Sequence, residues 1–250
     1  MKINGINVLI TGGGRGIGRH LVEQLDEAGA SLFVLEYDEH LCQELTQLAS
    51  GRVRAVQCDV ANAEAVDIAI QTVADAGFDI DVLINNAGII HSEPLVNMLS
   101  RNERTHSRDN WRKVMATDLD SVFFVTSRVV DHMLVKRKKG VVISISSIAA
   151  NGNAGQSAYS AAKAGVNALT HTWAKELGPL GLRFIAIAPG FIDTPSTRAA
   201  LSEAMLAKLQ QQVPLRRLGG MQAVSQAVHY AIENDYLTGS ILEVDGGLVL

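Results

Sequence analysis

The stretch that decides the fold is Thr11-Gly12-Gly13-Gly14-Arg15-Gly16-Ile17-Gly18, which directly follows the apolar run at 6–10. Glycines at 12, 16 and 18 give the spacing G-x-x-x-G-x-G, which differs from the G-x-G-x-x-G fingerprint of many dinucleotide-binding turns. Residues without side chains let backbone N–H groups approach a pyrophosphate at the positive end of the helix that follows. The turn therefore predicts a strand, a tight turn and a helix that together bind a nucleotide.

Outward from this turn, short β-branched runs alternate with longer segments of helical period. The pattern predicts strands at 6–10, 31–36, 52–58, 80–84, 140–146, 183–188 and 240–244, and helices at 16–28, 39–49, 62–76, 109–138, 157–178, 200–212 and 221–234. This alternation is typical of an α/β, Rossmann-like, doubly wound parallel sheet of about seven strands with helices on both faces. No linker, charge block or repeat divides the pattern, so residues 1–250 are expected to form a single dinucleotide-binding domain.

Two segments interrupt the alternation. A polar, partly basic stretch at 89–110 is longer than a typical connection, and we interpret it as an inserted surface loop. Residues 190–213 follow a strand and mix glycine and proline with an amphipathic run. Because ligands bind at the carboxyl ends of parallel strands, this second segment is expected to form a substrate lid.

The composition excludes several classes of protein. The 22 Lys and Arg residues are balanced by 26 Asp and Glu, a formal net charge of -4, so nucleic acid is not expected as a partner. The N-terminus lacks signal-peptide features and no apolar run reaches the roughly 18 residues of a membrane span, which favours a cytoplasmic protein with no membrane partner. Cys42 and Cys58 are interpreted as small buried residues. No metal site is expected.

Glu36, at the end of the second predicted strand, indicates the cofactor. A carboxylate about 20 residues after the glycines can accept hydrogen bonds from the ribose hydroxyls of an adenosine. The 2'-phosphate of NADP would meet a like charge there, so Glu36 favours NAD. Arg15 opposes this preference, because a guanidinium in the turn could reach a phosphate.

Tyr159 and Lys163 lie four residues apart in a segment of helical period, and therefore share one helix face. An ammonium beside a phenol makes the phenol a stronger acid, which suits a general acid/base. Serine hydroxyls at 144, 146 and 147, at the end of the preceding predicted strand, can orient a carbonyl. These groups together suit hydride transfer with proton exchange at oxygen.

With these motifs in order, the chain resembles the short-chain dehydrogenase/reductase family over essentially its whole length. The matching motifs are the 11–18 turn, Asp59-Val60, Asn85-Asn86-Ala87-Gly88, Ser147, Tyr159-x-x-x-Lys163, Pro189-Gly190 and Asp245-Gly246-Gly247. The resemblance implies that Tyr159 is the catalytic acid/base and that the protein forms a homotetramer. It also implies a set of residues that line the NAD site: Gly12, Arg15, Gly16, Ile17, Gly18, Glu36, Asp59, Val60, Asn86, Ala87, Gly88, Tyr159, Lys163, Pro189, Gly190, Ile192 and Thr194.

Two positions depart from the family pattern. The usual spacing of 13 to the tyrosine points at Ser146, but counting along the strand from Gly140 favours Ser147 with one residue missing from the loop. We choose Ser147, because a loop absorbs a deletion more easily than a strand. The family's fourth catalytic residue, an asparagine on the long central helix, is replaced by Asp118, which keeps an acceptor oxygen but adds charge beside Lys163.

Three functions remain open from the sequence. The main interpretation is an NAD-dependent alcohol dehydrogenase or carbonyl reductase that interconverts a small-molecule secondary alcohol and a ketone. The alternative is an NADPH-dependent 3-oxoacyl thioester reductase, favoured by Arg15 and by the stretch at 155–159 and disfavoured by Glu36. The third is a nucleotide-binding member without catalysis, which only Asp118 supports.

Overall fold

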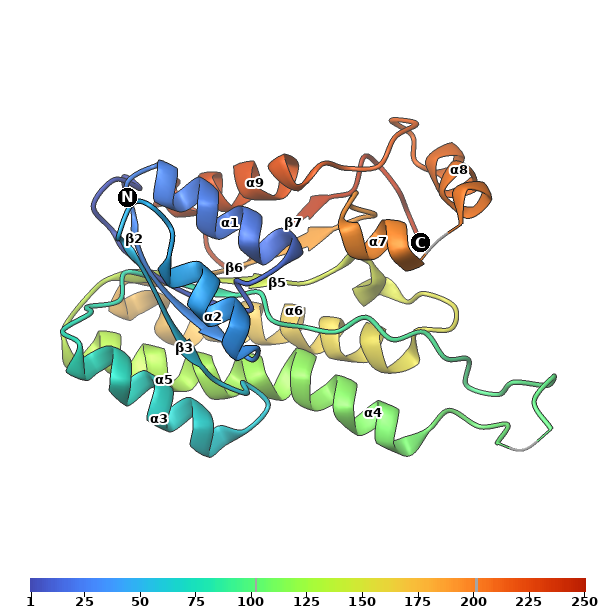
Figure 1. Cartoon of the computed structure of the whole chain (residues 1–250), viewed down its shortest axis with the longest axis horizontal. Helices are drawn as coiled ribbons and strands as arrows, with labels where there is room; N and C mark the ends of the chain where they lie inside the picture. The colour runs from blue at the N-terminus through green and yellow to red at the C-terminus, as the bar shows by residue number, and fades with distance from the viewer. Residues whose placement is uncertain (102, 201) are drawn as a thin grey trace.

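The glycine-rich turn joins strand β1 (Asn7–Thr11) to helix α1 (Gly16–Glu27), as predicted. The computed structural model describes residues 1–101, 103–200 and 202–250, and Figure 1 shows their arrangement. Asn102 of the expected loop and Leu201 of the expected lid lie outside the described residues.

Seven parallel strands form one sheet, in the order β3-β2-β1-β4-β5-β6-β7. The strands after β1 are β2 (Ser31–Glu36), β3 (Val53–Gln57), β4 (Val82–Asn85), β5 (Gly140–Ile145), β6 (Leu182–Pro189) and β7 (Ser240–Val244). Most of their residues are apolar and buried because the sheet is covered on both faces. The predicted fold class is therefore confirmed.

Helices cover both faces of the sheet. The remaining α-helices are α2 (Glu39–Thr46), α3 (Ala63–Asp75), α4 (Arg108–Met115), α5 (Ser121–Val135), α6 (Ser157–Leu177), α7 (Pro195–Ala200), α8 (Glu203–Gln212) and α9 (Met221–Glu233). Within β1, Val8 and Ile10 pack with the side chains of α1, α2 and α9, whereas Leu9 packs with those of α3 and α5. This alternation follows from the two-residue period of a strand and produces two separate cores.

The chain order reverses at β1, which pairs with β2 on one side and β4 on the other. Loops that leave the carboxyl ends of these strands diverge in opposite directions, and a crevice opens between them. This position is where ligands bind in doubly wound sheets. The glycine-rich turn and the residues after β4 and β5 all lie at this edge of the sheet.

The helix predicted at 109–138 is divided in the structure. Helix α4 runs into a π-helical turn, η1 (Ala116–Asp120), before α5 begins. A π-turn contains one residue more than an α-helical turn. The spacing of apolar residues in the sequence does not reveal this extra residue. The structure also places two short helices, α7 and α8, in the 190–213 segment where a single helix beginning at 200 was predicted.

The segment between β4 and α4 extends away from the body of the molecule (Figure 1). We call residues 89–107 the arm. Within it, Val96 pairs with Thr105 in an isolated antiparallel bridge, and Asn97 N donates to Arg104 O at 2.6 Å. At its exposed end, the Leu99 side chain is 94% accessible.

Both cysteines are free and buried, as predicted, and burial raises the pKa of each thiol to about 11. Among the helices of the described residues, none combines the length and the apolar character needed to cross a membrane.

Candidate active site

The glycine-rich turn is packed against the segment that follows β4. Gly12 has φ +67°, and a Cβ there would lie 2.9 Å from Ala87 Cα. A Cβ on Gly18 would lie 2.0 Å from Gly12 O and 2.5 Å from Asn86 Nδ2. Side chains at 12 and 18 would therefore force the turn open, which explains why glycine is needed at these two positions.

The N-terminus of α1 has the features of an anion site. Its N-cap residue, Arg15, makes no capping hydrogen bond with its side chain, and the first turn contains no acidic residue. Gly16 has φ +55°, and no atom lies within 4 Å of the position of an added Cβ. Backbone N–H groups and the positive end of the helix dipole thus face open space, which fits the pyrophosphate of a dinucleotide.

Asn86 and Ala87 fix the turn rather than leaving their polar groups open to a ligand. Asn86 Nδ2 donates to Gly12 O at 2.7 Å and to Thr11 O at 3.1 Å. Thr11 Oγ1 accepts hydrogen bonds from the backbone N–H groups of Asn86 and Ala87 at 3.1 and 3.0 Å. The sequence does not single out Thr11, although a hydroxyl at the end of the first strand is well placed to receive these donors.

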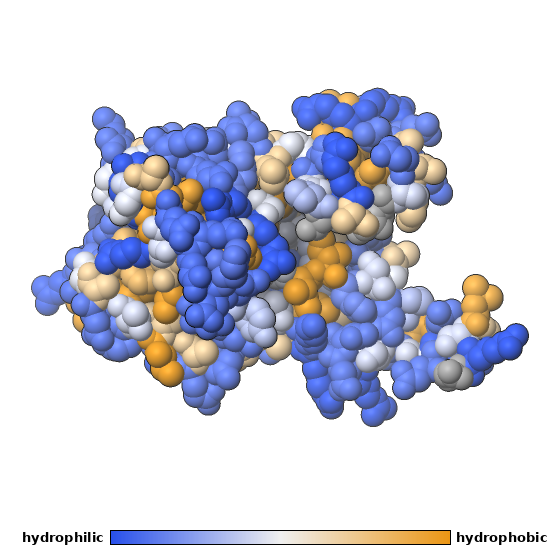
Figure 2. Space-filling model, in the orientation of Figure 1, coloured by the Kyte–Doolittle hydropathy of each residue, from blue (hydrophilic) through white to orange (hydrophobic). Residues whose placement is uncertain are grey.

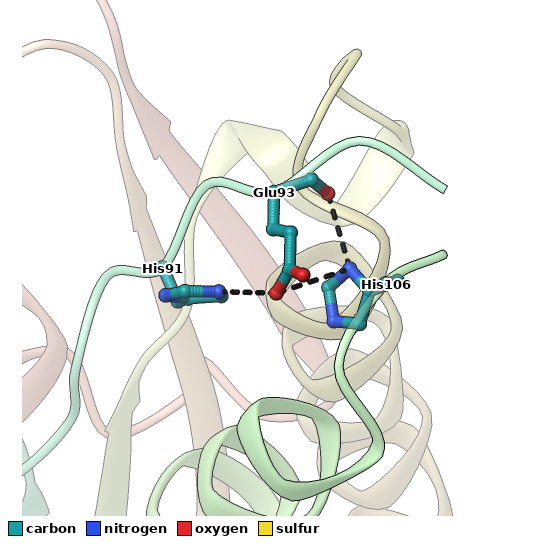
Figure 3. A group of neighbouring side chains, drawn as sticks. All are labelled: His91, Glu93 and His106. Atoms are coloured by element: carbon teal, nitrogen blue, oxygen red, sulfur yellow. Dashed lines mark hydrogen bonds and ion pairs between the residues drawn. The ribbon is translucent and has the colours of Figure 1, made fainter. Parts of the chain in front are cut away.

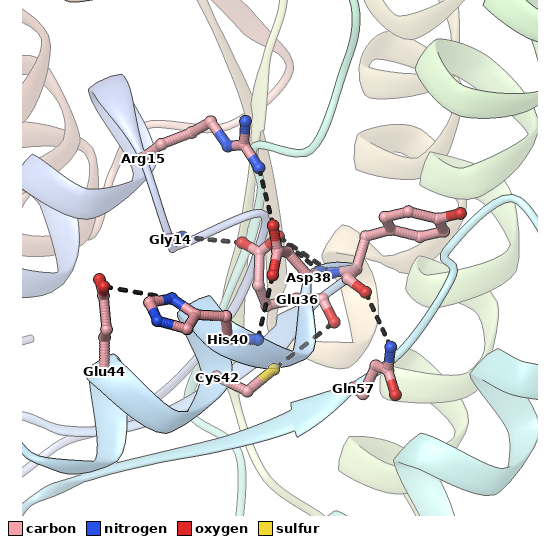
Figure 4. Close-up of polar contacts among 9 residues, drawn as sticks. Gly14, Arg15, Glu36, Asp38, His40, Cys42, Glu44 and Gln57 are labelled. Carbon is pink, nitrogen blue, oxygen red and sulfur yellow. Dashed lines mark hydrogen bonds and ion pairs between the residues drawn. The ribbon is translucent and has the colours of Figure 1, made fainter.

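Glu36 ends β2 directly beside the turn, and its side chain is almost fully buried (Figure 4). Its Oε2 atom accepts a hydrogen bond from Gly14 N at 2.8 Å, and its Oε1 atom accepts bonds from Tyr37 N and Asp38 N at 3.0 and 3.3 Å. These donors hold the carboxylate at the edge of the turn. Arg15, whose side chain is exposed, extends instead toward Asp38 at 3.5 Å.

Asp59 and Val60 follow β3 at the same edge of the sheet. Asp59 Oδ1 accepts a hydrogen bond from Ala61 N at 3.0 Å, and Val60 is buried. Their position beyond the carboxyl ends of the strands is compatible with contact to the adenine ring of a bound dinucleotide.

Tyr159 and Lys163 lie one turn apart on α6 and are both buried, at 9% and 4% exposure. Lys163 Nζ lies 5.6 Å from the centroid of the Tyr159 ring and donates a hydrogen bond to Ile145 O at 3.0 Å. The helical spacing thus produces the shared face that the sequence predicts, with an ammonium beside a phenol.

The two candidate serines at the end of β5 differ in their surroundings. Ser146 is buried, and its Oγ atom donates to Asn167 Oδ1 at 2.7 Å on α6. Ser147 is half-buried at the start of the 3-10 helix η2 (Ile148–Asn151), where its Oγ atom accepts a hydrogen bond from Ala149 N at 3.1 Å. The hydroxyl hydrogen of Ser147 is therefore available to a ligand, whereas Ser146 serves the packing of α6.

Asp118 lies in the π-turn and is completely buried. Its Oδ1 atom accepts a hydrogen bond from Ile89 N at 2.7 Å, and its Oδ2 atom has no partner among the described residues. A Cβ on Gly88 would lie 3.1 Å from Asp118 Oδ1 and 3.5 Å from Lys163 Nζ, so the glycine leaves room for both side chains. Burial raises the pKa of Asp118, and the Lys163 ammonium lowers it in part.

The residues after β6 close the other side of the crevice. Gly190 N donates to Val244 O at 3.0 Å, and a Cβ on Gly190 would lie 2.7 Å from Asp245 Cα. Ile192 is buried, and Thr194 Oγ1 accepts a hydrogen bond from Thr197 N at 3.1 Å. Figure 2 shows that the surface is hollowed between the region of α7 and α8 and the region of α4 and the arm.

The C-terminus belongs partly to this wall. Leu248 is buried against Ile148 and Val213 of the same chain. Val249 remains 91% exposed.

Comparison with known proteins supports one family. The family model of short chain dehydrogenases matches residues 6–204. The chain is 33% identical over 253 residues to the 3-oxoacyl-(acyl-carrier-protein) reductase FabG of Vibrio cholerae, and 34% identical over 256 residues to that of Thermotoga maritima, with full coverage of both chains in each pair.

Solved structures give the same result. The crystal structure of gox2181 superposes with a TM-score of 0.88 at 30% identity, covering 98% of this chain and 97% of that one. A putative gluconate dehydrogenase from Agrobacterium tumefaciens also gives 0.88, at 28% identity, covering 98% and 96%. The fold, the glycine-rich turn and these matches together confirm the resemblance seen in the sequence: the chain belongs to the short-chain dehydrogenase/reductase family and is an oxidoreductase that binds a nicotinamide cofactor.

Proposed function

We propose that this protein interconverts a 3-oxoacyl thioester and the corresponding 3-hydroxyacyl thioester, with Tyr159 as the acid/base and NAD(H) as the hydride carrier. The main observation in support is the buried pair of Tyr159 and Lys163 on α6, whose ammonium donates a hydrogen bond to Ile145 O, two residues before Ser147. An acid, a cation and a hydroxyl donor in this arrangement serve carbonyl reduction.

The thioester substrate rests on the relatives. The main interpretation from the sequence was a simple alcohol or ketone, and the names of the relatives match the alternative, a 3-oxoacyl reductase, better. The similarity extends over the entire chain, including the segments that form the crevice walls.

The choice of NAD rests on this chain's own residues. The carboxylates of Glu36 and Asp38 lie at the rim of the turn, where the adenosine ribose of a dinucleotide is expected. Arg15 is the cation that could offset them, but it is paired with Asp38 in the structure. A 2'-phosphate would therefore meet net negative charge, whereas ribose hydroxyls would find acceptors.

When bound, the nicotinamide supplies or accepts the hydride at the substrate carbon. The phenol of Tyr159 gives its proton to the carbonyl oxygen as that carbon is reduced, and takes it back in the oxidation direction. Lys163, held by Ile145 O, places positive charge next to the phenolate that forms. The Ser147 hydroxyl donates to the carbonyl oxygen and orients it.

Asp118 occupies the position of the family's catalytic asparagine. Its Oδ1 atom keeps the acceptor function by receiving Ile89 N–H, and its Oδ2 atom makes no hydrogen bond within the described part of the chain. Because burial raises the pKa of Asp118, the neutral acid is favoured relative to an exposed aspartate, and a neutral acid can also donate a hydrogen bond. We therefore assign Asp118 to support Lys163 in the active enzyme.

The second candidate function is NAD-dependent oxidation of a secondary alcohol without a thioester. The structural similarity to a putative gluconate dehydrogenase favours it, as does the acidic rim that selects NAD. In this case Tyr159, Lys163 and Ser147 would have the same roles, and the reaction would run from the alcohol to the ketone.

The test is to measure nicotinamide absorbance with acetoacetyl-coenzyme A and NADH, beside simple ketones with NADH and polyhydroxy acids with NAD. The proposal expects kcat/KM for the thioester to exceed that for the simple ketones by about a hundredfold or more, since remote binding energy raises turnover. Turnover of a polyhydroxy acid without turnover of the thioester would establish the second candidate instead.

The acid/base role is tested with Tyr159→Phe and a matched control, Tyr236→Phe, whose side chain is 98% exposed on the surface. We expect Tyr159→Phe to lower kcat by about a hundredfold or more while NADH binding, followed by its fluorescence, is retained. The control should keep full activity. A Tyr159→Phe variant with the activity of the unmodified protein would overturn the assignment.

A further inference from the structure

Two histidines and a glutamate of the arm come together outside the crevice (Figure 3). Glu93 lies between the two imidazole rings: its Oε2 atom is 2.9 Å from His91 Nε2 and 3.9 Å from His106 Nδ1. The Nδ1 atom of His106 is also 3.1 Å from the backbone oxygen of Glu93. One nitrogen or oxygen from each side chain lies within 4.8 Å of the others.

The carboxylate of Glu93 is held in place by further donors. Ser107 N donates to its Oε1 atom at 2.8 Å, and Asn110 Nδ2 donates to its Oε2 atom at 3.0 Å. Together with His91 Nε2, these donors fix the direction of both carboxylate oxygens. Such outer contacts orient a ligand before an ion binds.

His106 can present a free Nδ1 lone pair when the hydrogen bond between Nδ1 and Glu93 O is given up. Its side chain is only 7% exposed, and its Nε2 atom makes no hydrogen bond among the described residues. The ring can therefore carry its proton on Nε2 and leave Nδ1 unprotonated. The ring also lines a surface pocket with Trp111 and Ser157, so His106 is reached from the surface.

We infer that His91 Nε2, Glu93 Oε2 and His106 Nδ1 bind a divalent transition-metal ion of the zinc class. Two imidazoles and one carboxylate are a ligand set that Zn²⁺ takes, usually with water in the fourth position. Bonds of about 2.0 to 2.1 Å in a tetrahedron separate ligand atoms by about 3.3 Å. The two separations from Glu93 Oε2, 2.9 and 3.9 Å, bracket this value, so small rotations of the rings complete the site.

Charge near the cluster limits the expected affinity. Arg108 and Arg112 line the same pocket as His106, and Arg112 is paired with Asp109 at 3.2 Å. The anion of Glu93 attracts a cation, while the guanidinium groups oppose it. We therefore expect a dissociation constant in the micromolar range, weaker than that of structural zinc sites built from cysteines.

The position of the cluster gives the ion a structural role. Glu93 N donates to Gly155 O at 2.6 Å, and Gln156 Nε2 donates to Ser92 Oγ at 3.1 Å. The cluster is thus attached to the turn immediately before α6, the helix that begins at Ser157 and contains Tyr159. A bound ion would fix the arm to the start of this helix.

The experiment uses the full chain without an affinity tag, stripped with a chelator and titrated with Zn²⁺ by calorimetry. We expect one ion per chain, and at least tenfold weaker binding in His91→Gln and in His106→Gln. The matched control is His40→Gln: His40 pairs with Glu44 at 3.3 Å on the exposed surface of α2, without a second histidine. This variant should bind Zn²⁺ as tightly as the unmodified protein.

Limited proteolysis gives a second readout that does not depend on activity. Arg101 and Arg104 are exposed in the arm, and trypsin cleaves after such residues. Zn²⁺ should slow this cleavage several-fold in the unmodified protein and not in His91→Gln. Because the His91 side chain is the more exposed of the two, at 31%, His91→Gln supports the test even where His106→Gln unfolds. Equal affinity in all variants, or less than one ion bound per chain, would overturn the inference.

Discussion

Replacement of Glu36 by alanine is expected to reverse the preference between NADH and NADPH. The Glu36 carboxylate is 5% exposed and accepts three backbone hydrogen bonds, from Gly14, Tyr37 and Asp38. It is therefore fixed in position and cannot turn away from a 2'-phosphate. Two unit charges about 4 Å apart repel by about 4 kcal/mol at an effective dielectric of about 20, and solvent at the rim reduces this to about 2 kcal/mol.

These energies convert into measurable ratios. A repulsion of about 2 kcal/mol corresponds to about a 30-fold preference for NADH in the unmodified protein. Glu36→Ala removes this repulsion and also removes an acceptor for the ribose hydroxyls, which is worth about 1.5 to 3 kcal/mol for NADH. The ratio of kcat/KM for NADH to that for NADPH should then fall by several hundredfold or more.

The ratio of kcat/KM for NADH to that for NADPH is the correct readout because Glu36→Ala also loosens the glycine-rich turn. Loss of the bond from Gly14 N weakens binding of both dinucleotides, and this effect cancels in the ratio. Steady-state kinetics at fixed ionic strength measure it, with Glu44→Ala as the control because Glu44 is an acidic residue of α2 away from the turn (Figure 4). Equal efficiency with both dinucleotides in the unmodified protein, or a ratio that Glu36→Ala leaves unchanged, would refute the argument.

Three further predictions concern the catalytic serine, Asp118 and assembly. Ser147→Ala should lower kcat by about tenfold or more, whereas Ser146→Ala should mainly lower the melting temperature. A larger loss of kcat in Ser146→Ala would assign the catalytic role to Ser146 instead. Asp118→Asn should stabilise the protein at pH 7 by about 1 to 2 kcal/mol, or about 2 to 8 °C. Burial raises the pKa of Asp118 in the folded protein above its unfolded value of about 3.9. Aspartate at 118 therefore costs stability only as pH rises from about 3.9 through the folded pKa, so the stability gained by Asp118→Asn should shrink toward pH 4. A gain in stability that stays constant down to pH 4 would contradict this prediction. Phe123 is 50% exposed and lies beside Leu169 in an apolar depression of the surface. We expect the protein to be a homotetramer and Phe123→Asp to form smaller species, as measured by light scattering. A monomeric unmodified protein would exclude the tetramer.

The positions of the strands could be predicted because strands buried on both faces are uninterrupted apolar runs. Strand β5 was expected at 140–146 and is observed at Gly140–Ile145, and β2 agrees at both ends. The choice of Ser147 over Ser146 used the same regularity, because a one-residue shift reverses the direction of a side chain in a strand. Ser146 is buried and Ser147 is half-buried, and the choice of Ser147 stays a prediction.

Contacts that depend on several distant segments could not be predicted. Glu36 was predicted to lie beside the ribose, but its bond to Gly14 N depends on the packing of β2 against the turn. No metal site was expected from the sequence, in which His91 and His106 are 15 positions apart in a loop without periodicity. The bridge between Val96 and Thr105 and the hydrogen bond from His106 N to Leu95 O fold the arm back and bring the second histidine to Glu93.

The π-turn at Asp118 has one part that the sequence predicts and one that it does not. Helical periodicity places Asp118 on the long central helix, but the extra residue of η1 determines where its carboxylate points. That carboxylate accepts Ile89 N–H at the root of the arm, while Glu93 N–H, four residues later, is donated to Gly155 before α6. The arm is therefore attached to both helices that face the crevice, α6 and the η1–α5 unit. A change in the arm can then move the surroundings of Lys163 and Tyr159 together, so we expect substitutions at Ile89 to Glu93 to alter KM and kcat in parallel rather than substrate affinity alone.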